Sequence, residues 1–351
     1  MLTLRTTNRV LKVLKTAQKS EQSFHRWLGP TLRELKRRKD SQGPEKPVHR
    51  KTFLEWNYDT EIYAFSKRLG EEFNNDLLQQ ALTERSYIFH EEERQKSVGI
   101  EQPTLNLSDN KELVSKGSDF IDDIVKRYLR TVLPRLPEEG IIGIHKYLTS
   151  IETLSHVSFH IGTSELILCA EFPVEKLTLS NVLKSIIAAL VESSGDSRAA
   201  LFVRDFIITQ ISDKDLHQFW EPEEPIKLLS DILARDGIQS PEPRLIGCSG
   251  KNTILACFRV GLYTPDNKQM IGLGFGETVD IAHEMAARDS LRQLFGTSDN
   301  ILLPFHLNLD QLCASSDKNL FLNEWSQKTL PSRLTHFELR QAKEISSKLM
   351  Y

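Results

Sequence analysis

The feature that most restricts the fold is a change in the spacing of apolar residues near residue 215. From Trp56 to about Ile211 apolar residues recur every three or four positions, the period of α-helices packed on one side. After an acidic stretch with two prolines, residues 221–225, the spacing falls to two, which is typical of strands. The chain therefore predicts an all-α domain followed by a smaller domain that contains a sheet.

Two segments of the first domain predict its central helices. Lys111 to Val132 forms a long amphipathic pattern that ends at Pro134 and Pro137, and Val182 to Val191 is almost entirely apolar. Between the earlier helices and the long one, the polar stretch from His90 to Asp109 breaks the periodicity and predicts an inserted loop.

The second domain has the order α-β-β-β-α. We expect a helix over Ile226 to Arg235 and a second over Asp280 to Phe295. Between them, Arg244 to Gly247, Ile254 to Tyr263 and Gln269 to Phe275 predict three strands. This order within about 70 residues resembles the double-stranded RNA-binding domain, which recognises the shape of duplex RNA.

The net charge of −3 conceals a basic arm on an acidic body. Residues 1–51 carry 14 Lys and Arg against 4 Asp and Glu, and the remainder carries 31 against 44. The arm therefore has a net charge of +10 and the body of −13. A basic arm favours a polyanionic partner, an import signal, or both.

The first twenty residues favour an import signal. They are basic, rich in Ser and Thr, and hold no acid before Glu21, while their apolar residues can cluster on one side of a helix. This composition is typical of a mitochondrial transit peptide rather than a secretory signal, and it predicts a location in the mitochondrial matrix. The alternative is a basic amphipathic helix that stays on the mature protein.

Positive charge continues beyond any plausible cleavage site into an extended arm. Its basic residues are expected to neutralise RNA phosphates, because each bound Lys or Arg displaces condensed counterions. The candidates are Arg26, Arg33, Arg37 and Arg38.

Several other classes of protein find no support. Four widely spaced cysteines without a CxxC pair favour neither a zinc site nor a disulfide framework. No apolar run of 18 residues predicts a membrane span. We expect no cofactor, no metal and no small-molecule substrate.

Two stretches resemble the ribonuclease III family. Leu77 to Tyr87 reads LLQQALTERSY, similar to the family's opening LLxxALTHRSY helix, and Asn110 to Phe120 resembles its signature NERLEFLGDSV. The apolar segment Ser185 to Leu190 is similar to the helix that follows the family's second pair of carboxylates. The resemblance implies the helical ribonuclease III fold, a fold that dimerises in the family's enzymes.

The resemblance also implies four carboxylates that hold two Mg²⁺ ions, and this chain lacks them. The matching positions are Val114, Ser118, Asn181 and Lys184. A valine cannot ligate a metal, and an ammonium repels a divalent cation. We therefore expect an inactive nuclease domain and no enzyme.

Two further patterns are weak. Gly272 to Gly276 looks like a phosphate-binding glycine loop but lacks the GxGxxG spacing and falls on the third predicted strand. His156 and His160 share a helical face, but no neighbouring carboxylate or cysteine completes a metal site.

The RNA-binding module has also lost its main contacts. Where the family has a phosphate-clamping lysine pair at the start of the last helix, this chain has Val279 and Asp280, and the family's loop histidine is missing. We expect weak binding to duplex RNA. The remaining candidate contacts are Lys227, Lys251, Asn252, Lys268 and Thr278, and ordinary solvated surface groups are an equal interpretation.

Together these features resemble the mitochondrial large-subunit ribosomal protein family forty-four. The resemblance runs from about Trp56 to Gly296 and includes the stretches Trp56 to Asp59, Ala200 to Gln210 and Gly276 to Val279. It implies a structural constituent of the mitochondrial large ribosomal subunit, with ribosomal RNA and neighbouring ribosomal proteins as partners.

Two alternatives remain open at this point: a mitochondrial RNA-processing nuclease, and a free RNA-binding factor or inactive partner of a true ribonuclease III outside the ribosome. The predicted parts are a transit peptide (1–20), a basic extension (21–52), a ribonuclease III-like domain (53–215), a linker (216–224), a double-stranded RNA-binding-like domain (225–297) and a tail (298–351).

Overall fold

The computed structural model describes residues 28–41, 43, 49–100, 105, 107–212, 214–265, 269–297 and 318–328. The chain divides into two compact units, residues 1–52 and residues 53–351. The predicted transit peptide lies outside the described residues, as does most of the predicted tail.

Among the described residues of the first unit, residues 28–41 are helical and Arg50–Thr52 form the 3-10 turn η1. Leu28, Leu32 and Leu35 recur at helical spacing and are all exposed. The helix is thus amphipathic, with an exposed apolar stripe beside its basic residues.

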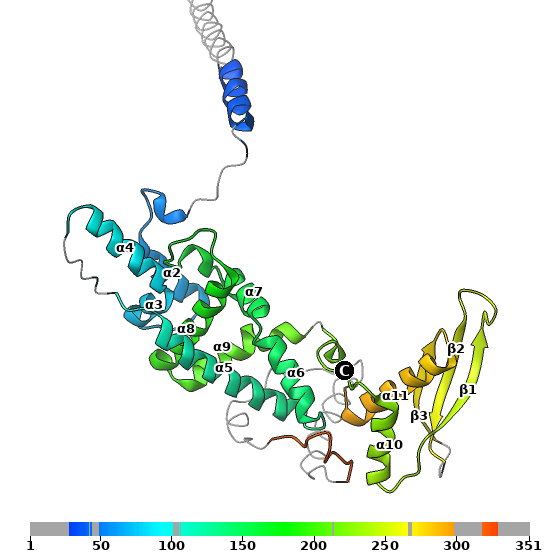
Figure 1. Ribbon diagram of the computed structural model, residues 1–351. Helices are drawn as coiled ribbons and strands as arrows, with labels where there is room; N and C mark the ends of the chain where they lie inside the picture. The colour runs from blue at the N-terminus through cyan, green and yellow to red at the C-terminus, as the bar shows by residue number, and fades with distance from the viewer. Residues whose placement is uncertain are drawn as a thin grey trace, which may run out of the picture. The chain divides into compact units, whose positions relative to one another are not determined.

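The larger unit begins with an all-α part, as the sequence predicts (Figure 1). Its helices are α2 (Tyr58–Leu69), α3 (Asn75–Leu82), α4 (Arg85–Ser97), α5 (Lys111–Val132), α6 (Glu138–Leu148), α7 (Ile151–Ile161), α8 (Lys176–Ser194) and α9 (Asp196–Phe206). The short 3-10 turns η2 (Thr163–Glu165), η3 (Ile208–Ile211) and η4 (Leu216–Gln218) follow α7 and α9.

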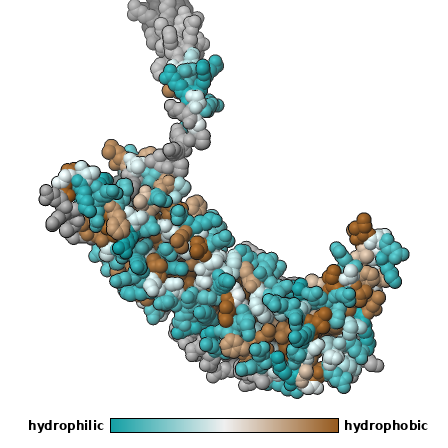
Figure 2. Space-filling model, viewed as in Figure 1, coloured by the Kyte–Doolittle hydropathy of each residue, from teal (hydrophilic) through white to brown (hydrophobic). Residues whose placement is uncertain are grey.

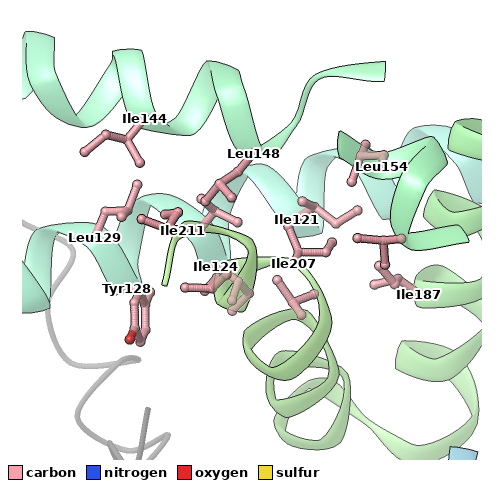
Figure 3. Close-up of a cluster of buried hydrophobic side chains, with 14 of the residues drawn as sticks. Ile121, Ile124, Tyr128, Leu129, Ile144, Leu148, Leu154, Ile187, Ile207 and Ile211 are labelled. Carbon is pink, nitrogen blue, oxygen red and sulfur yellow. The ribbon is translucent and has the colours of Figure 1, made fainter. Parts of the chain in front are cut away.

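Helix α8 is the centre of this part. Ten of its residues are buried, and α3, α5, α7 and α9 all pack against it. Figure 3 shows the adjoining core, where Ile121 and Ile124 of α5 meet Leu148 of α6, Leu154 of α7 and Ile187 of α8. The apolar run that marked α8 in the sequence is therefore the result of burial on almost every side.

Side-chain caps fix where several helices begin. The side chains of Asn57 and Asn74 accept hydrogen bonds from the free N–H groups of α2 and α3, and Ser150 does the same for α7. Gly70 and Gly162 end α2 and α7 in the left-handed conformation that only glycine adopts without strain.

The loop predicted from His90 to Asp109 begins later than expected. Helix α4 continues to Ser97, although none of its residues is buried. Its second half reads Glu-Glu-Glu-Arg-Gln-Lys, residues with strong intrinsic helix propensity and no apolar periodicity. The expectation was wrong because it relied on periodicity alone.

The second part of this unit has the expected α-β-β-β-α order. It consists of α10 (Pro225–Arg235), β1 (Glu242–Ser249), β2 (Cys257–Tyr263), β3 (Met270–Gly276) and α11 (Val279–Phe295). The sheet is antiparallel in the order β1-β2-β3. Strand β2 starts three residues later than predicted, because Ile254 and Leu255 belong to the exposed turn and not to the ladder.

The glycine run on β3 serves the packing of α11. A Cβ at Gly274 would lie 2.1 Å from the backbone oxygen of Ala282, and one at Gly272 would lie 2.5 Å from that of Ala286. Only glycine lets the helix and the strand approach so closely. This contact accounts for the run and agrees with our rejection of a phosphate loop.

Part of the tail docks on the body. The indole N–H of Trp325 donates to the backbone oxygen of Arg135 at 2.8 Å, and its ring meets Phe295 edge to face with centroids 5.0 Å apart. The Asn319 amide donates to the backbone oxygens of Leu133 and Leu136 at 2.9 and 2.8 Å. We call residues 318–328 the strap.

Among the described residues, no helix has both the length and the apolar composition that crossing a membrane requires.

Candidate functional site

The four positions that match metal ligands lie together at the crossing of α5 and α8. Val114 and Ser118 are one turn apart on α5, and Asn181 and Lys184 are three residues apart on α8. All four are half-buried. The spacing puts each pair on one face of its helix.

Gly117 determines how closely the two helices cross. A Cβ at this position would lie 1.9 Å from the backbone oxygen of Lys184 and 2.6 Å from its carbonyl carbon. The backbone of α5 therefore touches the backbone of α8 at the site itself. The spacing between the two helices is therefore fixed at this point.

The chemistry at these positions is different from that of a metal site. The four side chains supply methyl groups, a hydroxyl, an amide and an ammonium. Hydroxyl and amide oxygens are weak Mg²⁺ ligands without carboxylates, and the ammonium adds a repelling charge. Lys116 of α5 pairs with Glu192 at 2.7 Å, which engages the single carboxylate that α8 carries.

In the parts of the chain that the structure describes, no three His, Cys, Asp or Glu side chains lie close enough together to hold a metal ion. The rings of His156 and His160 lie next to each other on the exposed side of α7, with centroids 4.3 Å apart and planes inclined by 59°. This geometry fits a pair of surface histidines.

The predicted RNA contacts of the second part do not gather into one site. Lys227 on α10 pairs with Glu224 at 3.2 Å, while Lys251 and Asn252 are exposed in the turn between β1 and β2. Thr278 caps α11, since its hydroxyl accepts from the Ile281 N–H at 3.2 Å. Lys268 lies outside the described residues.

Helix α11 begins with Val279 and Asp280, where the resemblance to the double-stranded RNA-binding domain led us to expect no lysine pair. Val279 and Ile281 are both exposed apolar residues there. The helix N-terminus therefore offers an apolar and acidic surface where a phosphate clamp would need cations.

The basic arm keeps its charge exposed. Arg37 and Arg38 pair with Glu34 at 3.8 and 3.3 Å, and all three side chains are largely solvated. Such pairs contribute little to stability and yield easily to a phosphate. Arg33 is exposed on the same helix, and Arg26 lies outside the described residues.

The sequence interpretation missed two aromatic–arginine pairs on the sheet. The Arg259 guanidinium lies 5.7 Å from the ring centroid of Phe275, and that of Arg244 lies 5.1 Å from the ring of Tyr263. The period-two alternation of β2 could have shown that Arg259 and Tyr263 share a face. It could not have shown the cross-strand partner of either residue.

Comparison with known proteins follows the two parts of the larger unit. Residues 57–190 match the family model for the endonuclease domain of large ribosomal subunit protein mL44, and residues 220–326 match that of the MRPL44 dsRNA-binding domain. Large ribosomal subunit protein mL44 of Caenorhabditis elegans is 31% identical over 281 residues, which cover 79% of this chain and 70% of that protein.

The chain belongs to the mL44 family.

The bounds of the two mL44 matches can be compared with the helices and the strap of the structure. The endonuclease-domain match begins at Asn57, the cap of α2, and ends inside α8, so it includes Val114, Ser118, Asn181 and Lys184. The second match ends at Ser326, so the family's RNA-binding-domain model includes most of the strap.

The chain is also similar in sequence to proteins named ribonuclease 3. Ribonuclease 3 of Enterococcus faecalis is 26% identical over 235 residues, covering 65% of this chain and 95% of that enzyme. The nuclease domain of ribonuclease III from Campylobacter jejuni aligns in structure with a TM-score of 0.36 and 19% identity, covering 44% of this chain and 97% of that one.

Proposed function

We propose that this chain is a non-catalytic structural constituent of the mitochondrial large ribosomal subunit. Its membership of the mL44 family is the observation that carries the proposal. The ribonuclease III-like fold then serves as a scaffold, and its partners are ribosomal RNA and neighbouring ribosomal proteins.

The side chains at the α5–α8 crossing support the absence of catalysis. Hydrolysis by two metals needs hard anionic oxygens that bind Mg²⁺ and polarise the attacking water. Val114, Ser118, Asn181 and Lys184 supply none. A close crossing of α5 and α8 without metal ligands fits a protein that uses a nuclease-like shape for assembly.

We assign RNA contact mainly to the basic arm. Arg33, Arg37 and Arg38 are exposed on one helix, where Arg37 and Arg38 pair with the solvated carboxylate of Glu34. Lys227, Lys251, Asn252, Lys268 and Thr278 are secondary candidates. Arg26 completes the arm. Inside a ribosome many weak phosphate contacts suffice, so a strong isolated clamp is not required.

The test is sedimentation of a detergent-cleared mitochondrial lysate through a sucrose gradient, with and without EDTA. The proposal predicts that the chain travels with the large subunit in both conditions. A slow peak clear of both subunits would contradict it and favour an RNA-binding or RNA-processing factor outside the ribosome. The presence of the chain in the matrix fraction, shortened at its N-terminus, would agree with the predicted transit peptide.

A further inference from the structure

The outer face of the three-stranded sheet is the strongest feature that the proposed function leaves unused. Gly272 and Gly274 of β3 face α11, so the alternating residues Leu273 and Phe275 point to the opposite side. Phe275 pairs in register with Arg259 of β2. The face away from α11 therefore carries both aromatic–arginine pairs.

The two pairs flank a glycine. Gly261 lies between Arg259 and Tyr263 on this face, and a Cβ there would meet Ile246 at 2.7 Å and Tyr263 at 3.1 Å. Gly261 therefore leaves a small apolar surface between the two arginines. Along β2 the distance from residue 259 to residue 263 is about 13 Å, given a rise of about 3.3 Å per residue.

On this face Phe275 and both arginines are exposed, and Tyr263 is half-buried. Phe275 is 55% exposed, Ile246 is 43% exposed, and Arg259 is exposed. Among the described residues Arg259 has no carboxylate partner, whereas Arg244 shares Glu242 at 3.0 Å. Two guanidiniums against one carboxylate make the face locally positive on a body whose net charge is negative.

We propose that this sheet face binds unpaired RNA, with bases stacked on Phe275 and Tyr263 and phosphates held by Arg259 and Arg244. Aromatic rings accept any base, and guanidinium planes extend the stacking surface. A flat, locally positive face with two rings suits single-stranded nucleotides, whereas a duplex hides its bases from such rings. The inference rests on the proposed function, because it names a site for the ribosomal RNA.

Charge decides between RNA and a protein as the occupant. The turn between β1 and β2 ends in exposed Ile254 and Leu255, and Figure 2 shows hydrophobic residues gathered at this end of the molecule. A protein would suit that apolar turn. On the sheet face, however, the guanidiniums lie over the rings and are oriented for a polyanion with flat bases.

The experiment uses the full chain and a single-stranded RNA of about ten nucleotides, a length within the usual site size. One base is 2-aminopurine, whose fluorescence falls when it stacks on a ring. We expect Phe275→Leu to weaken binding roughly ten-fold and to reduce the quenching, because one of the two stacking rings is removed. Arg259→Lys should keep the charge, lose the planar group and give an intermediate effect.

Phe89→Leu is the matched control. Phe89 is also 55% exposed and also lies beneath an arginine, Arg85 at 5.2 Å, but it stands on helix α4. This variant should bind as the unaltered chain does. A fourth variant, Arg259→Gln, keeps the test valid if Phe275→Leu proves unstable in thermal unfolding.

The inference fails if the Phe275→Leu and Arg259→Gln chains are folded and both bind and quench as the unaltered chain does, and the face is then left to a protein neighbour. Failure of the proposed function looks different, since the unaltered chain would then sediment apart from the large subunit whatever its affinity for single-stranded RNA.

Discussion

Gly117 of α5 lies directly against the backbone of Lys184 of α8, so close that a Cβ at position 117 would come within 1.9 Å of the Lys184 oxygen. This contact fixes how closely α5 and α8 cross. Under the proposed function, the crossing keeps a nuclease-like arrangement of helices, while the Lys184 ammonium repels the divalent cations that a two-metal nuclease needs.

Gly117→Ala should destabilise the protein by about 3 kcal/mol, because the added methyl meets rigid backbone and not a movable side chain. Chemical denaturation followed by circular dichroism would measure the change. Gly247→Ala is the control, since nothing lies within 4 Å of a Cβ there. Equal stability of the two variants would show that the helices do not cross as closely as described.

The crossing should regain metal binding when its carboxylates are restored. The variant with Val114→Glu, Ser118→Asp, Asn181→Asp and Lys184→Glu places four acids together, and their mutual repulsion should lower the Tm without metal. Millimolar Mn²⁺ should then raise it by about 5–10 °C, since binding to the folded state stabilises it. A similar shift in the unaltered chain would contradict the loss of the metal site.

The strap should contribute to the stability of the body. Asn319→Ala removes the donor to two backbone oxygens, Leu133 and Leu136, and should cost about 1–3 kcal/mol because both acceptors lose their partner. Asn323→Ala, at an exposed position of the same segment, should have no measurable effect. Thermal unfolding followed by tryptophan fluorescence distinguishes the two, and indistinguishable curves would mean that the strap is not docked.

His145 should make the stability of the protein sensitive to mild acid. Burial lowers the pKa of His145, despite the attraction of Asp122 at 3.0 Å, so the folded protein keeps the ring neutral where the unfolded chain protonates it. The resulting stability is complete above the unfolded pKa of about 6.5 and is lost as the pH falls through the folded value.

The measurement for this prediction is Tm as a function of pH between about 7.5 and 5. His145→Gln should flatten the fall, and His160→Gln, at an exposed position, should leave it unchanged. If all three profiles coincide, the ring of His145 titrates alike in the folded and unfolded chains.

The sequence predicted correctly the bounds of helices whose apolar spacing results from burial. The bounds of α5 were predicted correctly, because a long apolar stripe ends in two prolines. The end of α4 was not, since its helix depends on propensity and buries nothing. Strand β2 was begun too early because Ile254 and Leu255 are apolar yet exposed. The periodicity of apolar residues indicates burial. It therefore does not predict a helix that is exposed, and it mispredicts apolar residues that lie in an exposed turn.

The site was predictable only where a family motif placed it. Val114 and Lys184 were located through the motif, and the structure shows that they share a crossing. The strap and the face around Phe275 carry no motif, since their meaning depends on partners far away in the chain or on another strand. Only the folded structure shows which residues these partners are.

The measurement that tests the central claim most directly is the stoichiometry of this chain in salt-washed mitochondrial large subunits, by quantitative mass spectrometry, together with a Mg²⁺-dependent cleavage assay on duplex RNA. We predict that the chain is equimolar with the other large-subunit proteins and that it releases no RNA fragments. Substoichiometric amounts, or cleavage by the purified chain, would contradict the account.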